Sequence, residues 1–386
     1  MKKILVVAMA DSIHTARWLE QFRDTEIKFM LFPSSPHRRV HPRIKQMLKT
    51  DSGVNLTLSW GLRMFSLPLW VIDRFADNRL RGLLLRRMLR RERPEIVHAM
   101  ETQGAGYVMR RALRKSISRP RVMLTIWGSD LFWFRQFPRH KRKLKETLNL
   151  VDDLALECNR DVAIAHDLGY KGRVIPPFPI TGGYDVEVLS EIASLVPPSK
   201  RKVILVKGHT RFVGQAQIAL VALQELRELL SGYEIFVYSA DSKARRMARH
   251  FGKDGLLHIR CYRRGELTHA KLLEIFAKTR IYIGISLSDG ISVSLQEAMV
   301  CGAFPIQTNT SCADEWIVDG KSGFIVDPYN TTLIVSALRK ALENDALVDA
   351  ASKINLATAQ QRLSTSALSE AIRGFYIVQT SRPCLD

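Results

Sequence analysis

The sequence lacks most of the patterns that hold metal ions in proteins. Its five cysteines are scattered over 386 residues with no C-x-x-C pair, which indicates a reducing compartment and argues against a structural zinc site. It has no H-E-x-x-H pair, and no two aspartates stand at i and i+2, a spacing at which two carboxylates could share a divalent cation. The sequence therefore predicts no bound metal.

Long hydrophobic runs are also missing. No run approaches the roughly 18 uninterrupted apolar residues that span a bilayer. The first ten residues, with two lysines followed by seven apolar residues, are too short for a signal peptide and are typical of a first buried strand. The stretch Trp60–Ile72, rich in aromatic residues and leucine but broken by Gly61 and Pro68, is either core or a shallow hydrophobic surface patch. We expect a cytoplasmic protein that is not integral to the membrane.

Acidic residues are scarce in the first half of the chain. Residues 1–180 contain 34 Lys and Arg against 17 Asp and Glu, and so carry +17 of the formal charge of +20. Such a basic half suits nucleic acid, an anionic membrane surface or an acidic substrate. Because the arginine runs lack interleaved aromatic residues and any helix-turn-helix, RRM or KH pattern, we do not expect nucleic acid.

One arginine-rich segment, Arg79–Arg93, has the period of a helix. Its leucines recur at helical spacing among seven arginines. Such a helix could lie on an anionic bilayer surface as a peripheral contact. Alternatively, it is a solvated helix whose arginines surround a stripe of leucines.

Apolar strand-like runs alternate with helix-forming runs along the whole chain, which predicts an α/β protein with parallel sheets. The run Ile4–Ala8, its polar turn and the helical run His14–Phe22 open a Rossmann-like domain that lacks G-x-G-x-x-G, so we do not expect dinucleotide binding. The length exceeds that of one core, and prolines and glycines cluster at 174–183. We therefore predict an N-terminal domain at 1–183 and a C-terminal domain at 184–386, with a disordered tail at 380–386.

The most informative stretch covers residues 281–306. A β-branched run ends at a Ser-Asp-Gly turn, and a helix and a second short apolar run follow. The free amides of residues 290–294 would face the crevice where open α/β sheets bind ligands, a place suited to phosphate. Asp289 and Glu297 bracket these amides, and carboxylates accept hydrogen bonds from hydroxyl groups, which together describes a nucleotide sugar. Alternatively, Asp-Gly is an ordinary turn, and Glu297 closes a capping box with Ser294.

This stretch resembles the motif of two acidic residues separated by seven others in the retaining GT-B glycosyltransferases, in particular family 4. Residues 314–328 match the segment with which that family closes its nucleotide site. The short segment that begins at Asp11 is similar to the family's opening loop. The segment that begins at Trp127 is similar to the family's His-Gly-Ser-Asp turn, with Trp127 where many members have His. At the first acidic position, Asp289 stands where many relatives carry Glu. The resemblance implies two Rossmann-like domains that face each other across a cleft, with a last helix, 366–378, crossing back to the first.

The resemblance also implies roles for individual residues. In the family, the first acid contacts the donor sugar, the amides hold the diphosphate, the second acid binds the ribose, and basic side chains meet the β-phosphate. The donor-binding residues so assigned are Gly208, Gly290, Ile291, Ser292, Val293, Ser294, Glu297 and Tyr262. The catalytic residues so assigned are Lys207, Arg211, Asp289 and Asp130. The acceptor-binding residues so assigned are Asp11, His14, Trp127 and Gly128.

Some of these positions have a simpler interpretation. Asp130 either orients the acceptor hydroxyl or caps a helix that begins at Leu131. His14 either meets a ligand or packs against its own helix, and Lys207 and Arg211 could belong to an ordinary charged loop.

The implied reaction moves a hexose from a UDP- or GDP-sugar to a hydroxyl of a glycan or lipid-linked acceptor. Anomeric configuration is retained, no cofactor is needed, and the setting is surface polysaccharide or lipopolysaccharide biosynthesis. Two other functions fit the same sequence. One is a nucleotide-sugar 2-epimerase of GT-B fold. The other is a non-catalytic basic module that binds membrane or polyanion on a degenerate transferase fold.

Overall fold

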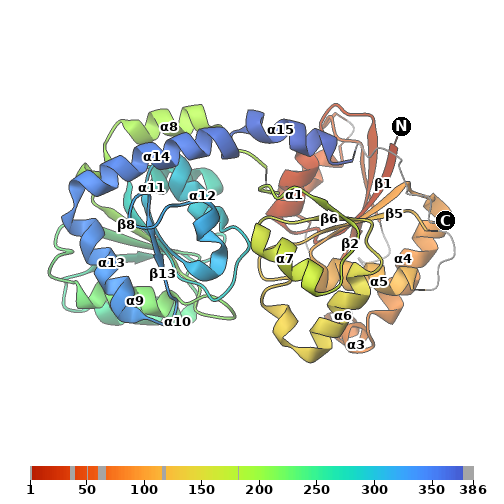
Figure 1. Cartoon of the computed structure of the whole chain (residues 1–386), viewed down its shortest axis with the longest axis horizontal. Coiled ribbons are helices and arrows are strands. Elements are labelled where there is room, and N and C mark those ends of the chain that lie inside the picture. Colours follow the sequence, from red (N-terminus) through yellow and green to blue (C-terminus); the bar gives the residue numbers. More distant parts are fainter. Residues whose placement is uncertain are drawn as a thin grey trace. The chain divides into compact units, whose positions relative to one another are not determined.

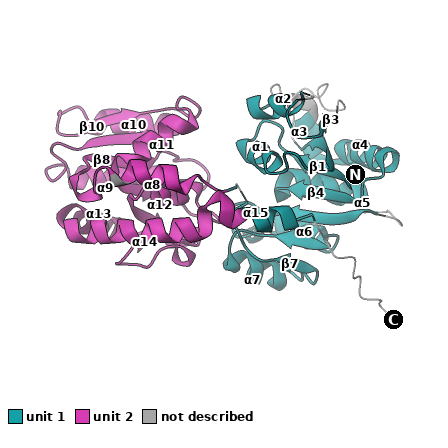
Figure 2. Ribbon diagram, turned by 90° about the horizontal axis from the view of Figure 1, so that it is seen from above, with its two compact units in different colours: residues 1–182, 369–386 teal, residues 183–368 magenta. Residues whose placement is uncertain are grey.

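A computed structural model describes residues 2–34, 40–49, 51–59, 67–114, 119–180 and 182–376. The chain divides into two compact units, residues 1–182 with 369–386 and residues 183–368 (Figure 2). Each unit is a parallel β-sheet flanked by helices (Figure 1), which confirms the α/β prediction. None of the helices described is long and apolar enough to cross a membrane.

Unit 1 has a seven-stranded sheet in the order β3-β2-β1-β4-β5-β6-β7. Its strands are β1 (Lys2–Ala8), β2 (Ile27–Pro33), β3 (Leu56–Leu58), β4 (Ile96–Met100), β5 (Arg121–Thr125), β6 (Asp153–Ala155) and β7 (Arg173–Ile175). Its helices are α1 (Ile13–Glu20), α2 (Pro42–Met47), α3 (Leu67–Phe75), α4 (Arg79–Glu92), α5 (Tyr107–Leu113), α6 (Pro138–Leu148) and α7 (Asn159–Asp167). The central strands β1 and β4 consist mostly of buried apolar residues, because helices cover both faces of the sheet.

Unit 2 has a six-stranded sheet in the order β10-β9-β8-β11-β12-β13. Its strands are β8 (Val203–Lys207), β9 (Glu234–Tyr238), β10 (His258–Cys261), β11 (Thr279–Gly284), β12 (Phe304–Thr308) and β13 (Phe324–Val326). Its helices are α8 (Val186–Ser194), α9 (Ala216–Glu225), α10 (Ser242–Phe251), α11 (His269–Ala277), α12 (Val293–Val300), α13 (Thr331–Glu343) and α14 (Asp345–Leu363). The last helix, α15 (Thr365–Gly374), begins in unit 2 and ends in unit 1.

The strand order reverses at one place in each sheet. β1 pairs with both β2 and β4 in unit 1, and β8 pairs with both β9 and β11 in unit 2. In open α/β sheets, ligands bind beyond the carboxyl ends of the strands at such a switch point. Lys207 ends β8, and the stretch that follows Gly284 leaves β11 at the same edge.

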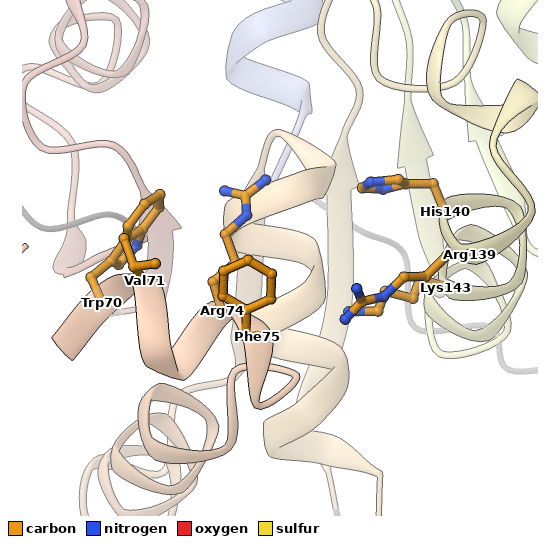
Figure 3. Close-up of a pocket in the computed structure, with 7 residues that line it drawn as sticks. All are labelled: Trp70, Val71, Arg74, Phe75, Arg139, His140 and Lys143. Carbon is orange, nitrogen blue, oxygen red and sulfur yellow. The ribbon is translucent and has the colours of Figure 1, made fainter. Parts of the chain in front are cut away.

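The structure describes only the second half of the Trp60–Ile72 stretch. Residues 60–66 lie outside the described residues, and the rest belongs to α3. On α3 the side chains of Ile72 and Phe75 are 62% and 74% exposed, and Figure 3 draws Phe75 beside the cavity described below. This end of the stretch is therefore a hydrophobic surface patch. The predicted disordered tail, residues 380–386, also lies outside the described residues.

Helix α4 confirms the helix predicted at Arg79–Arg93. Leu85 and Leu89 are buried in the core of unit 1, and Arg81, also buried, forms an ion pair of 2.7 Å with Asp73. Most of the other arginines of α4 lie on its outer face, as expected of a solvated helix around a leucine stripe. Because Leu83 remains 60% exposed there, contact with a membrane surface stays a prediction.

The end of the described chain is inserted into unit 1. The hydroxyl of Tyr376 accepts a hydrogen bond of 2.9 Å from Trp18 Nε1 and lies 2.7 Å from His98 Nδ1, while His98 Nε2 lies 2.7 Å from Thr125 Oγ1. The rings of Trp18 and Phe375 meet edge to face at 4.6 Å. A neutral imidazole, with one donor and one acceptor nitrogen, satisfies both hydroxyl partners.

The buried His98 should make unit 1 sensitive to acid. Burial lowers the pKa of His98 to about 3, whereas an unfolded histidine titrates near 6.5. In this pH range His98 is therefore protonated in the unfolded state but not in the folded state, and stability is lost as the pH falls from 6.5 toward 3. We expect the free energy of unfolding to fall by up to about 1.4 kcal/mol per pH unit in this window.

Urea unfolding at several pH values, followed by tryptophan fluorescence, measures this slope, because five of the six tryptophans belong to unit 1. His98→Gln, which can still bond both hydroxyls, should reduce the slope of the free energy of unfolding against pH by the contribution of about one proton. The exposed His166→Gln serves as the control and should keep the wild-type slope. An unchanged slope in His98→Gln would show that His98 is not the group responsible.

Candidate functional site

Two loops at the carboxyl edge of the unit 2 sheet are fastened together. The loop after β8 runs from Gly208 to Gln215, and Gln215 N donates to Ile285 O at 3.0 Å. In return, Leu287 N donates to Val213 O at 2.7 Å. These two hydrogen bonds bring the end of β8 next to the Ser-Asp-Gly turn that follows β11.

The loop after β8 is also tied to β9 and α10. Asp241, the N-cap of α10, accepts hydrogen bonds from Thr210 N and Oγ1 at 2.8 and 2.7 Å. Although burial works in the other direction, the hydrogen bonds from Ala244 and Thr210 lower the pKa of Asp241 to about 2. Gly208 packs so closely that a Cβ there would lie 2.7 Å from Tyr238 O, so any other residue would displace this loop.

Lys207 and Asp289 form an ion pair between the two loops. The distance from Lys207 Nζ to Asp289 Oδ2 is 3.5 Å, and both side chains remain about one-quarter exposed. Burial acts to lower the pKa of Lys207, but the Asp289 carboxylate outweighs it and raises the pKa above its ordinary value. Lys207 therefore carries a positive charge at the switch point of the sheet.

Helix α12 begins beside this ion pair with unused amides. In the hydrogen-bond network of the described residues, the backbone N–H groups of Ile291, Ser292, Val293 and Ser294 have no acceptor. The N-cap Ser292 is buried and makes no side-chain capping bond. Gly290 N, in contrast, already donates to Asp289 Oδ1 at 3.0 Å. Four free amides at the positive end of a helix form a binding place for an anionic group.

Glu297, on the second turn of α12, does not form the capping box. Its side chain is 5% exposed, and its Oε1 lies 2.8 Å from Nε2 of His269, the first residue of α11. The capping interpretation of Glu297 is thus wrong, because its carboxylate bonds to a side chain of the neighbouring helix α11 and not to the backbone at the start of α12. Sequence reasoning did not identify His269, since nothing in its local pattern points to α12.

Two other residues that were assigned to the donor site, Arg211 and Tyr262, take no part in the Lys207–Asp289 ion pair. Arg211 is exposed and makes no ion pair with any described residue. The ring of Tyr262 stacks on Phe236 at 6.0 Å, so one of its faces is occupied. His209, which sequence reasoning also missed, lies near Lys207: burial, and then the charges of Lys207 and Arg264, lower its pKa.

In unit 1, the buried Asp130 lies beside the half-buried Glu101, at the carboxyl ends of β5 and β4. Asp130 Oδ2 accepts from Thr102 N at 2.7 Å and from Trp127 N at 3.3 Å. Burial, followed by the charge of Glu101, raises the pKa of Asp130 well above its usual range. No α-helix begins at Leu131, as the next helical turn is the 3-10 segment Phe134–Gln136. The predicted helix cap is therefore wrong, and Asp130 fixes a turn instead.

Glu101 was not identified from the sequence. It has a positive φ of 77°, which is rare for a residue other than glycine. Its carboxylate accepts from the amides of Gly104 and Ala105, and a Cβ on Gly104 would lie only 2.3 Å from Glu101 Oε1. Burial raises the pKa of Glu101, while these two amides act to lower it. A strained residue beside a second carboxyl group is typical of a functional site.

The remaining predicted acceptor residues lie on the loops after β1 and β5. The rings of His14 and Trp127 meet edge to face at 5.5 Å. Gly128 adopts a positive φ of 47°, and Asp11 is exposed. The structure thus brings His14 and Trp127 together, and Trp127 offers no base at the position where the family has His.

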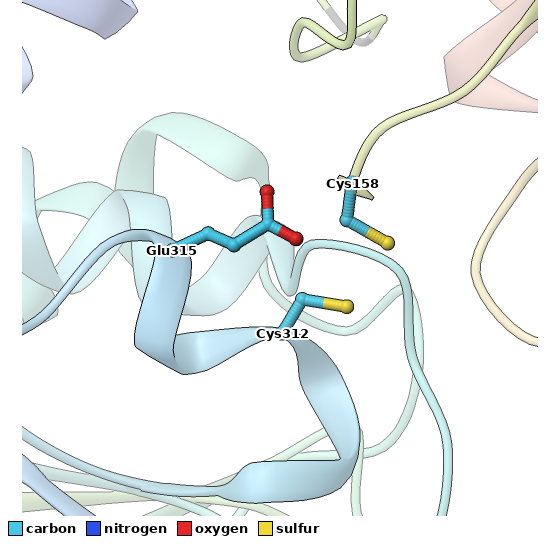
Figure 4. A group of neighbouring side chains, drawn as sticks. All are labelled: Cys158, Cys312 and Glu315. Carbon is cyan, nitrogen blue, oxygen red and sulfur yellow. The ribbon is translucent and has the colours of Figure 1, made fainter. Parts of the chain in front are cut away.

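Cys312 and Glu315 lie on adjacent short turns of unit 2 (Figure 4). Cys312 is buried and adopts a left-handed φ of 51°. Within unit 2 this pair supplies two potential metal ligands, fewer than a structural zinc site requires. Cys158, in unit 1, is buried and forms no disulfide with any described residue.

Comparison with known families matches both units. Residues 190–358 match the model described as glycosyl transferases group 1, and residues 74–156 match the model described as glycosyl transferase 4-like. No curated protein sequence matches the chain.

Solved structures match over nearly the whole chain. Anabaena HepE in complex with UDP aligns with a TM-score of 0.68 and 14% identity over 97% of this chain and 99% of its own. The sucrose-phosphate synthase of Thermosynechococcus elongatus aligns with a TM-score of 0.74 and 11% identity over 98% of each chain. The lipopolysaccharide outer core galactosyltransferase WaaB aligns with a TM-score of 0.67 and 13% identity over 97% of this chain and all of its own.

These structural matches confirm the predicted GT-B fold, and the two family models follow each other in the expected order along the chain. The chain belongs to the group 1, family 4-like glycosyltransferases, enzymes of GT-B fold that use nucleotide-sugar donors.

Proposed function

We propose that the protein transfers a hexose from a UDP- or GDP-sugar to a hydroxyl of a glycan or lipid-linked acceptor, with retention of configuration and without a metal ion. One observation carries this proposal. The four unused amides at the start of α12 stand between the Lys207–Asp289 ion pair and the buried Glu297. This order of positive and acidic groups suits a diphosphate with a sugar on either side.

Each group has a role in the proposed reaction. The amides of α12 and Lys207 stabilise the charge that develops on the departing diphosphate, in place of a divalent cation. Asp289 accepts hydrogen bonds from hydroxyls of the donor sugar, and Glu297 accepts them from the ribose. In this proposal unit 1 binds the acceptor and unit 2 the donor.

The absence of a base at Trp127 supports a retaining reaction. In such a reaction the leaving diphosphate oxygen takes the proton of the acceptor hydroxyl, so the protein needs to position that hydroxyl rather than deprotonate it. Asp130 is the candidate for this positioning, since the turn that it fixes leads directly to the predicted acceptor residues. The basic unit 1 suits an anionic or lipid-linked acceptor at a cytoplasmic membrane surface.

Glu297→Gln should raise the donor KM by about 10- to 100-fold and leave the fold intact, because it removes the charge from a carboxylate that binds hydroxyls. The amide oxygen of glutamine can still accept the bond from His269. The measurement is UDP or GDP release at varied donor concentration, after a thermal-shift screen across nucleotide sugars has identified the donor.

His269→Ala is the matched control, because it removes the hydrogen-bond partner of Glu297 and keeps the carboxylate. A lower melting temperature in Glu297→Gln with unchanged nucleotide affinity would assign Glu297 to the packing of α11 on α12. Incubation with donor alone tests the epimerase alternative, since an epimerase would interconvert sugars without an acceptor.

A further inference from the structure

A cavity of about 150 Å³ lies in unit 1 between helices α3 and α6. Trp70, Val71, Arg74 and Phe75 line it from α3, and Arg139, His140 and Lys143 line it from α6. Figure 3 shows the three side chains of α6 directed toward α3 across the cavity. None of the catalytic or donor-binding residues proposed above is among them.

The cavity is lined by cations and by no carboxylate. Lys143 has an acidic partner, Asp77, at 2.5 Å, but Arg74 and Arg139 form no ion pair within the described part of the chain. His140 Nδ1 lies 3.0 Å from the hydroxyl of Tyr107. Burial, and then the charges of Arg74, Lys143 and Arg139, lower the pKa of His140. The potential in the cavity is therefore positive and favours an anion.

The other walls are apolar and continue onto an exposed surface. Trp70, Val71 and Phe75 form one side of the cavity, and Ile72 follows them on the outer face of α3. Phe75 is 74% exposed and Ile72 is 62% exposed. Trp70 Nε1 is buried and has no acceptor among the described residues. Charged groups beside exposed apolar side chains suit a ligand that is itself half anionic and half apolar.

The cavity lies at the carboxyl edge of the sheet, where α/β domains bind ligands. Helix α6 follows the loop that leaves β5. Arg81 pairs with Asp73 on α3 and donates to Ser34 O just after β2. The charge of Arg74 also acts to lower the pKa of Glu101, so this arginine lies close enough to that carboxyl group to act on it.

We propose that the cavity between α3 and α6 binds the phosphate group of a phosphorylated lipid, with the apolar chain resting on Phe75 and Ile72. Arg74 and Arg139 meet the phosphate oxygens, and Trp70 offers them an indole N–H. This proposal rests on the proposed transferase function only in naming the acceptor class, because binding itself requires no transfer.

Three probes separate the two halves of this ligand: farnesyl diphosphate carries both, inorganic pyrophosphate carries the anion, and farnesol carries the chain. Calorimetry on the full chain should show that farnesyl diphosphate binds at least about tenfold more tightly than either part. Arg74→Gln combined with Arg139→Gln should weaken its binding by about 10- to 100-fold. Phe75→Ser should weaken the binding of farnesyl diphosphate and leave the binding of pyrophosphate unchanged.

The matched control is Arg246→Gln combined with Arg249→Gln, which removes two exposed arginines from one helix of unit 2. This variant and Lys207→Met, which tests for a diphosphate bound in the donor site, should bind farnesyl diphosphate like wild type. Two results would each overturn the proposal: equal binding of pyrophosphate and farnesyl diphosphate, or unchanged binding in the Arg74 and Arg139 double variant. UDP affinity measured on the same samples tests the transferase proposal separately.

Discussion

Lys207→Met should lower kcat by about 100- to 1,000-fold, the effect of removing one preorganised electrostatic group from an active site. Lys207 ends the central strand β8, and its ammonium lies 3.5 Å from Asp289 and next to the free amides of α12. A departing diphosphate gains negative charge at this place, and methionine has a similar length without the charge. The loss should appear mainly in kcat, because the interaction strengthens as the leaving group departs.

Single-turnover kinetics with saturating donor would measure this effect apart from donor binding. Lys202→Met is a suitable control, since Lys202 lies just before the amino end of β8, where its ammonium is 4.7 Å from the ring of Tyr233. The control should keep wild-type kcat. Should Lys207→Met raise KM with kcat unchanged, the lysine would be a contributor to ground-state binding alone.

The central strands and the nucleotide motif could be predicted because their signals are local. Strands buried on both faces require continuous apolar runs, and the predicted run Ile4–Ala8 lies within β1 and ends with it. The Ser-Asp-Gly turn and the start of α12 likewise follow from turn and helix preferences of adjacent residues. Local chemistry was therefore sufficient to find the edge of the sheet where Lys207 and Asp289 meet.

The elements that were missed carry weak local signals. The edge strands β3 and β7 contain three residues each, and β7 falls partly within the stretch that was predicted as a domain boundary. Helix α2 has only six residues, begins at Pro42 and was not predicted. Such short elements form because neighbouring strands and helices complete their hydrogen bonds, which no window of sequence reveals.

The missed site residues depend on contacts that are distant in sequence. His269 is identified only by Glu297, 28 residues away, and Glu101 only by the turn that it closes and by Asp130. The buried Glu297 required a partner, and that partner came from another helix. The sequence predicts which residues are polar, while the fold decides which of them meet.

Tyr376→Ala should lower the free energy of unfolding of unit 1 by about 3 to 5 kcal/mol, the usual effect of removing a buried aromatic ring. Tyr376 is fully buried, and its ring lies against Phe22, Phe29 and Trp18. Its hydroxyl is the hydrogen-bond partner of both Trp18 and His98. The substitution therefore opens a cavity and also leaves two buried nitrogens without a partner.

Tyr376→Phe divides this effect into its two parts. It keeps the ring and removes the hydroxyl, so it should cost about 1 to 3 kcal/mol, the penalty for leaving buried polar groups unsatisfied. Urea unfolding followed by tryptophan fluorescence measures both variants. Tyr329→Ala, at a tyrosine that is 74% exposed in unit 2, is the control and should change stability by less than about 0.5 kcal/mol. If Tyr376→Ala were as mild as this control, the end of α15 would not be part of the core of unit 1. If Tyr376→Phe were as severe as Tyr376→Ala, the hydrogen bonds to Trp18 and His98, rather than the packing of the ring, would hold the C-terminal segment in place.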